Sequence, residues 1–171
     1  MRYVQRYASP LGDLILAAQE EGLIGLWFEG QKHFPEGLKA SDDAELERAA
    51  PLFRMTRRWL DIYFSGREPG FSVPIHLEGT AFQTAVWRRL CAIPYGQTMT
   101  YGEIAGQMAR EEGRAHLSAQ AVGGAVGRNP VSILVPCHRV VGANGRLTGY
   151  AGGLERKQWL LELERTGSAA R

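Results

Sequence analysis

Two neighbouring residues, Cys137 and His138, have the side chains that nucleophilic chemistry requires. They come directly after a short apolar run, residues 131–135, and Pro136. The thiolate is the reactive form of cysteine, and a nearby imidazole or positive charge stabilises it. Because adjacent residues of an extended chain point to opposite faces, we expect a bridging water or a turn after Pro136 to connect the thiol and the imidazole. A Cys-His dipeptide alone is also typical of a buried, inert cysteine beside a hydrogen-bonded histidine.

The second cysteine, Cys91, has no such neighbour in the sequence, and we interpret it as a small hydrophobic residue. Two cysteines cannot form a disulfide framework or a zinc site with four cysteine ligands. No apolar run approaches the roughly 20 residues of a membrane helix, and no apolar segment follows Met1 as it does in a secretory signal. We therefore expect a cytoplasmic protein that does not bind membranes.

The charge of the chain is unevenly distributed. The 171 residues carry a formal net charge of +2, but residues 1–78 carry 9 basic and 12 acidic groups, whereas residues 79–171 carry 11 and 6. Of the 20 basic residues, 17 are Arg, whose guanidinium forms bidentate contacts with phosphate groups. This distribution predicts that the C-terminal half meets an anionic partner. The hydrophobic fraction of 44% is that of a packed globular protein.

The N-terminal part, residues 1–78, is predicted to be an α/β domain with a small antiparallel sheet and one main helix. Two apolar strands, 14–18 and 23–28, flank a turn. Asp42 and Glu45 form a capping-box pattern that opens a helical segment, in which Pro51 predicts a kink or a new helix start. Gly66 is expected to end that helix. A linker with one short strand at 71–75 follows.

The C-terminal part, residues 79–171, is predicted to be mainly helical and winged-helix-like. Its three helices have N-cap residues at Thr80, Thr100 and Ser118. We expect the first helix to run as far as Pro94. The second and third helices, joined by a turn-rich link, are expected to form a helix-turn-helix, which is typical of DNA-binding proteins.

The segment around the reactive pair is predicted to be β-structure. Residues 131–135 have the composition of a buried strand. Asn144 and Gly145 predict a hairpin turn between residues 140–141 and 147–148. A last helix is expected at 154–164, and a frayed tail at 166–171.

Longer motifs surround the Cys-His pair. It lies in the run Ile-Leu-Val-Pro-Cys-His-Arg-Val-Val at 133–141; upstream stand Ala-Val-Gly-Gly-Ala at 121–125 and Arg-Asn-Pro at 128–130. Downstream come Leu-Thr-Gly-Tyr-Ala-Gly-Gly-Leu at 147–154 and Trp-Leu-Leu at 159–161. Together these motifs resemble the active-site signature of the O6-alkylguanine-DNA alkyltransferases, also called methylated-DNA–protein-cysteine methyltransferases. The resemblance covers about residues 80–165, while the N-terminal half is similar only in size and element order.

The resemblance implies direct-reversal DNA repair by a suicidal methylated-DNA–protein-cysteine S-methyltransferase. Such a protein binds double-stranded DNA, flips an O6-alkylguanine out of the duplex and moves the alkyl group irreversibly to its own cysteine. It acts once, as a monomer, without a cofactor. Flipping is required because a stacked base cannot present its O6 substituent to a side chain.

The same resemblance assigns roles by motif position. Cys137 corresponds to the nucleophile, His138 to a general base that acts through a water, and Glu164 to the carboxylate that orients this histidine. Tyr101 corresponds to the phenol that hydrogen-bonds the guanine and protonates it, and Asn129 to a residue that hydrogen-bonds across the active-site turn. The alkyl and base pocket is expected to include Val135, Tyr150, Ala151 and Gly152. Without the resemblance, Glu164 would be interpreted as a solvated helix residue, and Asn129 as a turn former.

The third helix, about residues 118–127, corresponds to the family's recognition helix, which enters the minor groove. Its small residues permit close backbone approach, although the same residues are also typical of a helix packed into the core. DNA contacts are expected from Thr100, Gln120, Ala121, Gly123, Gly124 and Arg128. Gln120 departs from the family, most members of which carry an arginine that replaces the extruded base. Our hypothesis is that Gln120 is a surrogate wedge and that Arg114 or Arg128 supplies the lost phosphate affinity.

Two other functions stay open at this point. Relatives that sense alkylated DNA without catalysis have tryptophan in place of the reactive cysteine, so Cys137 argues against a non-catalytic DNA-binding module. A Cys-His hydrolase would need a distant histidine, and the candidates are His33, His76 and His116. Some family members bind zinc through N-terminal cysteine and histidine; residues 1–78 hold no cysteine and two histidines, so we predict no metal.

Overall fold

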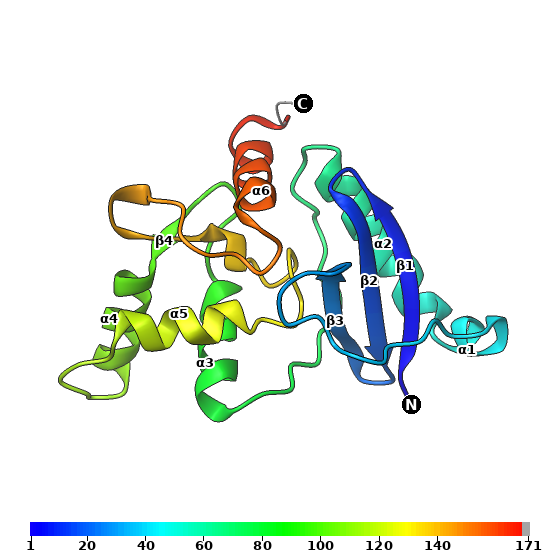
Figure 1. Cartoon of the computed structure of the whole chain (residues 1–171), viewed down its shortest axis with the longest axis horizontal. Coiled ribbons are helices and arrows are strands. Elements are labelled where there is room, and N and C mark those ends of the chain that lie inside the picture. The colour runs from blue at the N-terminus through cyan, green and yellow to red at the C-terminus, as the bar shows by residue number, and fades with distance from the viewer. Residues whose placement is uncertain (169–171) are drawn as a thin grey trace.

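The computed structural model describes residues 1–168. An N-terminal sheet backed by helices lies beside a mainly helical C-terminal part (Figure 1). This arrangement confirms the predicted fold class. Within residues 1–168, no helix is both long enough and apolar enough to span a bilayer.

The N-terminal sheet is a three-stranded antiparallel meander. Its strands, in spatial order, are β1 (Tyr3–Ser9), β2 (Gly12–Gln19) and β3 (Gly22–Phe28). The strands predicted at 14–18 and 23–28 are confirmed, whereas β1 was missed. In β1, Gln5 and Arg6 interrupt the apolar residues, so the segment lacks a continuous hydrophobic run although Tyr3, Val4 and Tyr7 are buried.

Two helices follow the sheet, α1 (Asp43–Arg48) and α2 (Ala50–Phe64). The capping box of Asp42 and Glu45 is formed, and Pro51 lies in the first turn of α2, so the new helix start is confirmed. The helix ends just before Gly66, which has a positive φ of 88°. The strand predicted at 71–75 is wrong, because this segment makes only one isolated bridge, between Ile75 and Leu23.

The C-terminal part has four α-helices in its described residues. They are α3 (Ala81–Leu90), α4 (Tyr101–Glu111), α5 (Ala119–Gly127) and α6 (Leu154–Thr166). The predicted N-caps at Thr80, Thr100 and Ser118 are confirmed, since each side chain accepts a backbone N–H of its helix. α3 ends earlier than predicted, at Leu90 rather than near Pro94. α6 continues two residues beyond 164 to a left-handed Gly167, and residues 169–171 of the predicted frayed tail lie outside the described residues.

The buried strand predicted at 131–135 is wrong. The segment is buried, but it winds into turns, and Ile133 has a positive φ of 70°. The cause is Asn129, whose side chain accepts a hydrogen bond from Val131 N at 3.0 Å and donates one to Val135 O at 2.8 Å. The chain therefore folds around this amide and enters the short 3-10 helix η1 (Cys137–Arg139).

The predicted hairpin at 140–148 is also wrong. β5 (Val140–Val141) pairs in parallel with β4 (Met99–Thr100), a distant segment directly before α4. A 3-10 turn, η2 (Ala143–Gly145), reverses the chain, and Gly142 N donates to Arg146 O at 2.7 Å. Among the described residues, 147–148 form no strand. The parallel pairing instead fixes the start of α4 beside the segment that follows Cys137.

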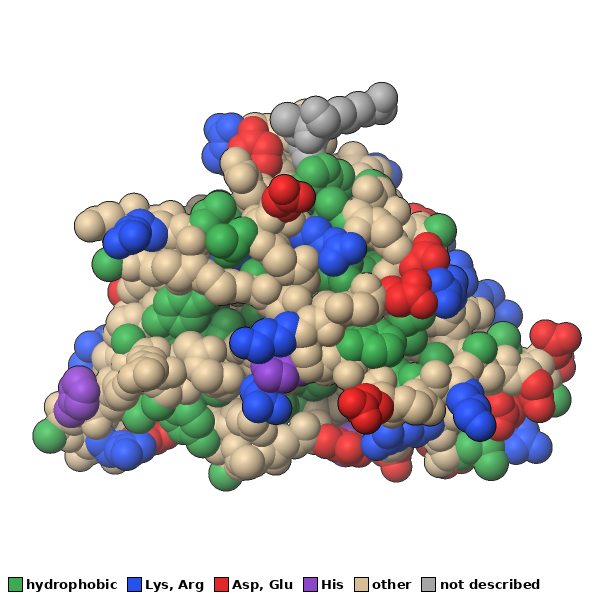
Figure 2. Space-filling view, viewed as in Figure 1, with side chains coloured by type: hydrophobic (Ala, Val, Ile, Leu, Met, Phe, Trp, Pro, Cys, Tyr) green, Lys and Arg blue, Asp and Glu red, His purple; other side chains and the backbone are tan. Residues whose placement is uncertain are grey.

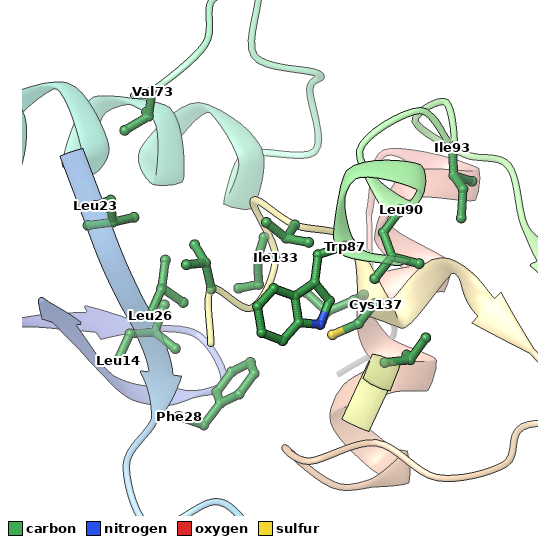
Figure 3. Close-up of a cluster of buried hydrophobic side chains, with 14 of the residues drawn as sticks. Leu14, Leu23, Leu26, Phe28, Val73, Trp87, Leu90, Ile93, Ile133 and Cys137 are labelled. Carbon is green, nitrogen blue, oxygen red and sulfur yellow. The ribbon is translucent and has the colours of Figure 1, made fainter. Parts of the chain in front are cut away.

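One hydrophobic cluster joins the two parts of the chain. Figure 3 shows side chains from the sheet, from α3 and from η1 meeting in it, with Trp87 and Cys137 on the C-terminal side. The backbone of β3 adds hydrogen bonds to the segment before the cysteine: Leu26 N donates to Pro130 O, and Ser132 N donates to Leu26 O, each at 2.9 Å. The N-terminal sheet therefore supports the segment that carries Cys137.

Candidate active site

Cys137 lies at the first position of η1 and lines a cavity of about 280 Å³. This volume is close to the lower end of the range for small-ligand pockets, about 300 Å³. Burial raises the pKa of the Cys137 thiol, while a hydrogen bond from Asn129 and the positive charge of Lys157 act in the opposite direction. The thiol is therefore protonated at neutral pH, and a base must take its proton before it can attack.

His138 is fully buried, and its Nε2 lies 2.6 Å from Oε2 of Glu164. Burial lowers the pKa of His138 despite the neighbouring carboxylate. Because an ionised carboxylate can only accept, Nε2 carries the proton and donates it to Glu164. The neutral imidazole then has its lone pair on Nδ1, and this atom has no hydrogen-bond partner within residues 1–168. The arrangement leaves a proton acceptor next to the cysteine in sequence.

Glu164 is also held by a cation, Arg139. Arg139 Nε donates to its Oε1 at 2.8 Å, and the guanidinium also donates through Nη2 to the same oxygen. Arg139 Nη1 donates to Ile93 O at 2.7 Å. Burial alone would raise the pKa of Glu164, but the hydrogen bonds from His138 and Arg139 outweigh burial and lower it. The carboxylate is ionised at neutral pH, which places Glu164 in a buried network rather than on a solvated helix face.

Sequence reasoning missed the contact of this network with the N-terminal part. The Oη of Tyr63, on α2, lies 3.4 Å from His138 Nε2, and the two rings meet edge-on. Nothing local in the sequence indicates a partner 75 residues away.

Tyr101 is the first residue of α4, and its ring lines the same cavity as Cys137. Its Oη donates to Thr148 O at 3.2 Å. Burial raises the pKa of Tyr101, so the phenol keeps its proton and can donate it. Thr100 uses its hydroxyl to cap α4 by accepting from Glu103 N, so its side chain positions Tyr101.

Lys157 was not identified from the sequence. It is fully buried on α6, and its Nζ donates to Thr148 O at 3.2 Å and to Gly149 O at 3.1 Å. It also lies over the Tyr101 ring, 5.9 Å from the centroid. Burial lowers its pKa to about 8. The only available signal is its helical spacing to Leu160 and Glu164, which puts a lysine on the buried face of α6.

The predicted pocket residues divide into two pairs. Tyr150 and Ala151 line the cavity, whereas Val135 and Gly152 do not. Val135 is buried and contributes its carbonyl to the hydrogen bond with Asn129. A Cβ on Gly152 would lie 2.7 Å from Cδ2 of Phe28, so this glycine permits close packing between the loop and the sheet. Both of these residues shape the pocket indirectly.

Apart from Thr100, which caps α4, the predicted DNA-contact residues lie on α5 or, in the case of Arg128, directly after it. Gln120, Ala121, Gly124 and Arg128 are exposed, and Gly123 lines the cavity beside the Tyr101 ring. The helix packs into the core through Val122, Ala125 and Val126. Its small exposed residues are therefore left free of the core. Arg114 is exposed on the preceding link and pairs with Glu112 at 3.5 Å.

No group of three or more His, Cys, Asp or Glu side chains in residues 1–168 is arranged to hold a metal ion. The prediction of no bound metal stays a prediction.

Comparison with known proteins follows the same division of the chain. Residues 2–77 match the family model described as 6-O-methylguanine DNA methyltransferase, ribonuclease-like domain, and residues 81–166 match the DNA binding domain of the same family. The chain belongs to the 6-O-methylguanine DNA methyltransferase family. The signature motifs between residues 121 and 161 fall inside the second match.

Similar proteins of this family cover nearly the whole chain. The methylated-DNA–protein-cysteine methyltransferase of Methanosarcina acetivorans is 44% identical over 95% of this chain and 97% of its own length. The protein of the same name from Mycolicibacterium paratuberculosis is 46% identical, over 95% and 92%. Among solved structures, Mycobacterium tuberculosis OGT in complex with DNA superposes with a TM-score of 0.80 at 40% identity, over 98% of this chain and 96% of that one.

Asn129 holds residues 131–135 in their turns, so its substitution should destabilise the protein. Asn129→Ala leaves Val131 N–H buried without a partner, while Val135 C=O keeps only its hydrogen bond from Cys137 N; an orphaned buried group of this kind destabilises a fold by about 1–3 kcal/mol. We expect a loss of about 1–3 kcal/mol in the free energy of unfolding, measured by urea denaturation. Asn144→Gly is the matched control, because Asn144 is exposed and its φ of 59° suits glycine. Equal stability of the two variants would contradict the role given to Asn129.

Proposed function

We propose that this protein repairs DNA by direct reversal: it transfers the alkyl group of an O6-alkylguanine in double-stranded DNA to Sγ of Cys137. The observation that carries the proposal is the position of this thiol. It lines a cavity and directly precedes a histidine whose Nε2 is bound by a buried carboxylate. The thioether is not hydrolysed, so each molecule acts once, and no cofactor takes part.

The proton of the thiol goes to His138. A water between Sγ and Nδ1 relays it, because Nδ1 is the free basic atom and the two side chains belong to adjacent residues. The imidazolium that forms is stabilised by Glu164, which already accepts from Nε2. Arg139 keeps this carboxylate ionised and fixed in place.

The alkyl carbon moves in one displacement. The S–C bond forms while the C–O6 bond of the guanine breaks, and the electron pair of that bond goes to the leaving purine. Tyr101 is protonated before the reaction and lines the cavity, and its phenol donates a hydrogen bond to the guanine as the guanine leaves. Lys157 holds the carbonyls of Thr148 and Gly149, so the loop that supports Tyr101 and Tyr150 has a fixed position.

The guanine reaches the cavity by base flipping. Cys137 is only 5% exposed, so a base that stays stacked in the duplex cannot reach it. α5 is the element that approaches DNA, because its exposed face carries small residues and ends at Arg128. The structural neighbour from M. tuberculosis, which was solved with DNA, supports this partner. Gln120, exposed in the first turn of α5, is placed to occupy the gap left by the base.

The two parts of the chain have different tasks in this proposal. Residues 79–171 bind DNA and carry the reaction, and residues 1–78 hold the reactive segment through β3 and Tyr63. The protein works as a monomer in the cytoplasm. The alternative is a non-catalytic module that senses alkylated DNA. Such a module does not require a nucleophilic thiol in the cavity.

The test of the proposal is intact-mass measurement before and after incubation with an oligonucleotide duplex containing O6-methylguanine. We expect one methyl group per protein molecule, located on Cys137 by peptide mapping. Cys137→Ala should accept none, and Cys91→Ala should accept the full amount. Labelling at Cys91, or an unmodified protein that releases product repeatedly, would refute the proposal.

The buried network predicts the pH dependence of transfer. Burial lowers the pKa of His138, so the imidazole is neutral at and above the ordinary histidine pKa of about 6.5. The decline in transfer rate that comes from protonation of His138 should therefore begin at a lower pH than the ordinary histidine pKa would give. Glu164→Gln should slow transfer about 100-fold or more at every pH, because the imidazolium loses its counter-charge.

Glu162→Gln is the matched control for this experiment, since Glu162 lies on the same helix and pairs with Arg165 at the surface. Circular dichroism should show that both variants are folded. A folded Glu164→Gln variant with the transfer rate of the unsubstituted protein would contradict the proposed role of the network.

Gln120 yields a separate prediction for DNA binding. If its amide hydrogen-bonds the unpaired cytosine, Gln120→Ala should weaken binding of the lesion duplex and slow transfer by up to about tenfold, the value of one hydrogen bond. Gln97→Ala, another exposed glutamine, is the control. Unchanged binding and an unchanged transfer rate in Gln120→Ala would show that this residue is not the wedge.

A further inference from the structure

Three basic side chains from both parts of the chain gather at the cavity. Lys32 and His33 lie in the turn after β3, and both line the cavity that contains Cys137. Arg128, at the C-terminal end of α5, does not line the cavity itself but stands between Gly127 and Asn129, which both do, and its charge acts on His33. All three side chains are exposed. Figure 2 shows a histidine flanked by basic side chains near the centre of one face of the molecule.

The turn that carries Lys32 and His33 is held in place. Lys32 N donates to Ala151 O at 3.1 Å, which ties the turn to the loop on the other side of the cavity. Gln31 is buried, and its Oε1 accepts from Phe28 N at 2.9 Å. His33 has a φ of 61°, a left-handed conformation that few residues other than glycine adopt. The two basic side chains therefore project from a fixed backbone.

The positive charge of this cluster is not neutralised by the protein. Within residues 1–168, Lys32, His33 and Arg128 form no ion pairs with carboxylates. Partial desolvation, together with the charges of Arg128 and Lys32, lowers the pKa of His33. An anion placed among the three would reverse the effect of those charges. Two of its members, Lys32 and His33, come from residues 1–78, where acidic groups outnumber basic ones.

We propose that Lys32, His33 and Arg128 form a phosphate-binding site for the DNA strand whose base enters the cavity. This inference rests on the proposed function, because only an extruded nucleotide brings its backbone to this position. The base is joined to the strand through its sugar, so the phosphates that flank it must lie at the mouth of the cavity. There they meet a guanidinium and an ammonium, the groups suited to phosphate oxygens. The N-terminal part thus contacts DNA directly, in addition to supporting the reactive segment.

The test compares a double variant, Lys32→Gln with His33→Asn, with the control Lys39→Gln. Asparagine tolerates the positive φ of His33, and Lys39 is an exposed lysine farther along the same loop. Each protein is measured for affinity to a lesion duplex at several salt concentrations, and for the rate of alkylation by the free base O6-benzylguanine. The free base has no phosphate, so it reports the chemistry of the cavity alone.

We expect the double variant to bind the duplex more weakly than the control. The slope of log affinity against log salt should be shallower by about 0.9 for each phosphate that the variant no longer neutralises. Its reaction with the free base should fall by a smaller factor than its affinity for the duplex, and its thermal unfolding midpoint should equal that of the unsubstituted protein. Unchanged affinity and salt slope would overturn the inference. An equal loss of reaction with the free base would also overturn it, because these residues would then act on the cavity rather than on phosphate.

Failure of the proposed function gives a different result. In that case the unsubstituted protein binds the duplex but transfers no alkyl group from either substrate. The salt dependence of binding still decides whether Lys32 and His33 contact phosphate.

Discussion

The candidate active site depends on the hydrogen bonds that His138 and Arg139 donate to the buried carboxylate of Glu164. The carboxylate accepts from His138 on η1 and from Arg139, the next residue, so α6 and the reactive segment are joined by two charge-assisted contacts. Arg139 extends the network to Ile93 O, beyond the end of α3. Removing one partner from a buried ionic network destabilises a protein by about 3–5 kcal/mol, because the remaining charge stays buried without compensation. The same bonds fix the histidine tautomer, so the contacts that hold the site together also prepare it for proton transfer.

The position of the cysteine depends on the N-terminal part as well. β3 hydrogen-bonds the segment on either side of Val131, Tyr63 of α2 contacts His138, and the backbone of Lys32 holds the loop at Ala151. The segment before Cys137, the ring of His138 and the loop at Ala151 thus each have a partner within residues 1–78. The sheet and α2 behave as a scaffold that sets the width of the cavity, which explains why a small cavity of fixed shape can form in a segment without regular secondary structure.

Helix starts could be predicted from the sequence because their hydrogen bonds are local. The caps at Asp42, Thr80, Thr100 and Ser118 all form as expected, since each side chain bonds within its own first turn. The reactive pair and Glu164 were found through motif resemblance, which the apolar pattern alone would not have provided. The strand predicted at 131–135 failed because one side chain, Asn129, outweighs the strand preference of five residues. The hairpin failed because β5 finds its partner about 40 residues upstream. Tyr63 was missed for a similar reason, because its partner His138 lies 75 residues away. Lys157 was missed because its partners are backbone carbonyls of the preceding loop, which have no signal in the sequence.

Proton transfer from the thiol requires that His138 be neutral, with its proton on Nε2, in the unreacted protein. Nitrogen-15 NMR of the histidine rings tests this directly, because the shifts of the two ring nitrogens distinguish the two tautomers and the cation. At pH 7 we predict a protonated Nε2 and an unprotonated Nδ1 for His138. Glu164→Gln should change this distribution of the proton between the two ring nitrogens. A doubly protonated ring, or a proton on Nδ1 alone, would leave Cys137 without its base and would contradict the proposed mechanism.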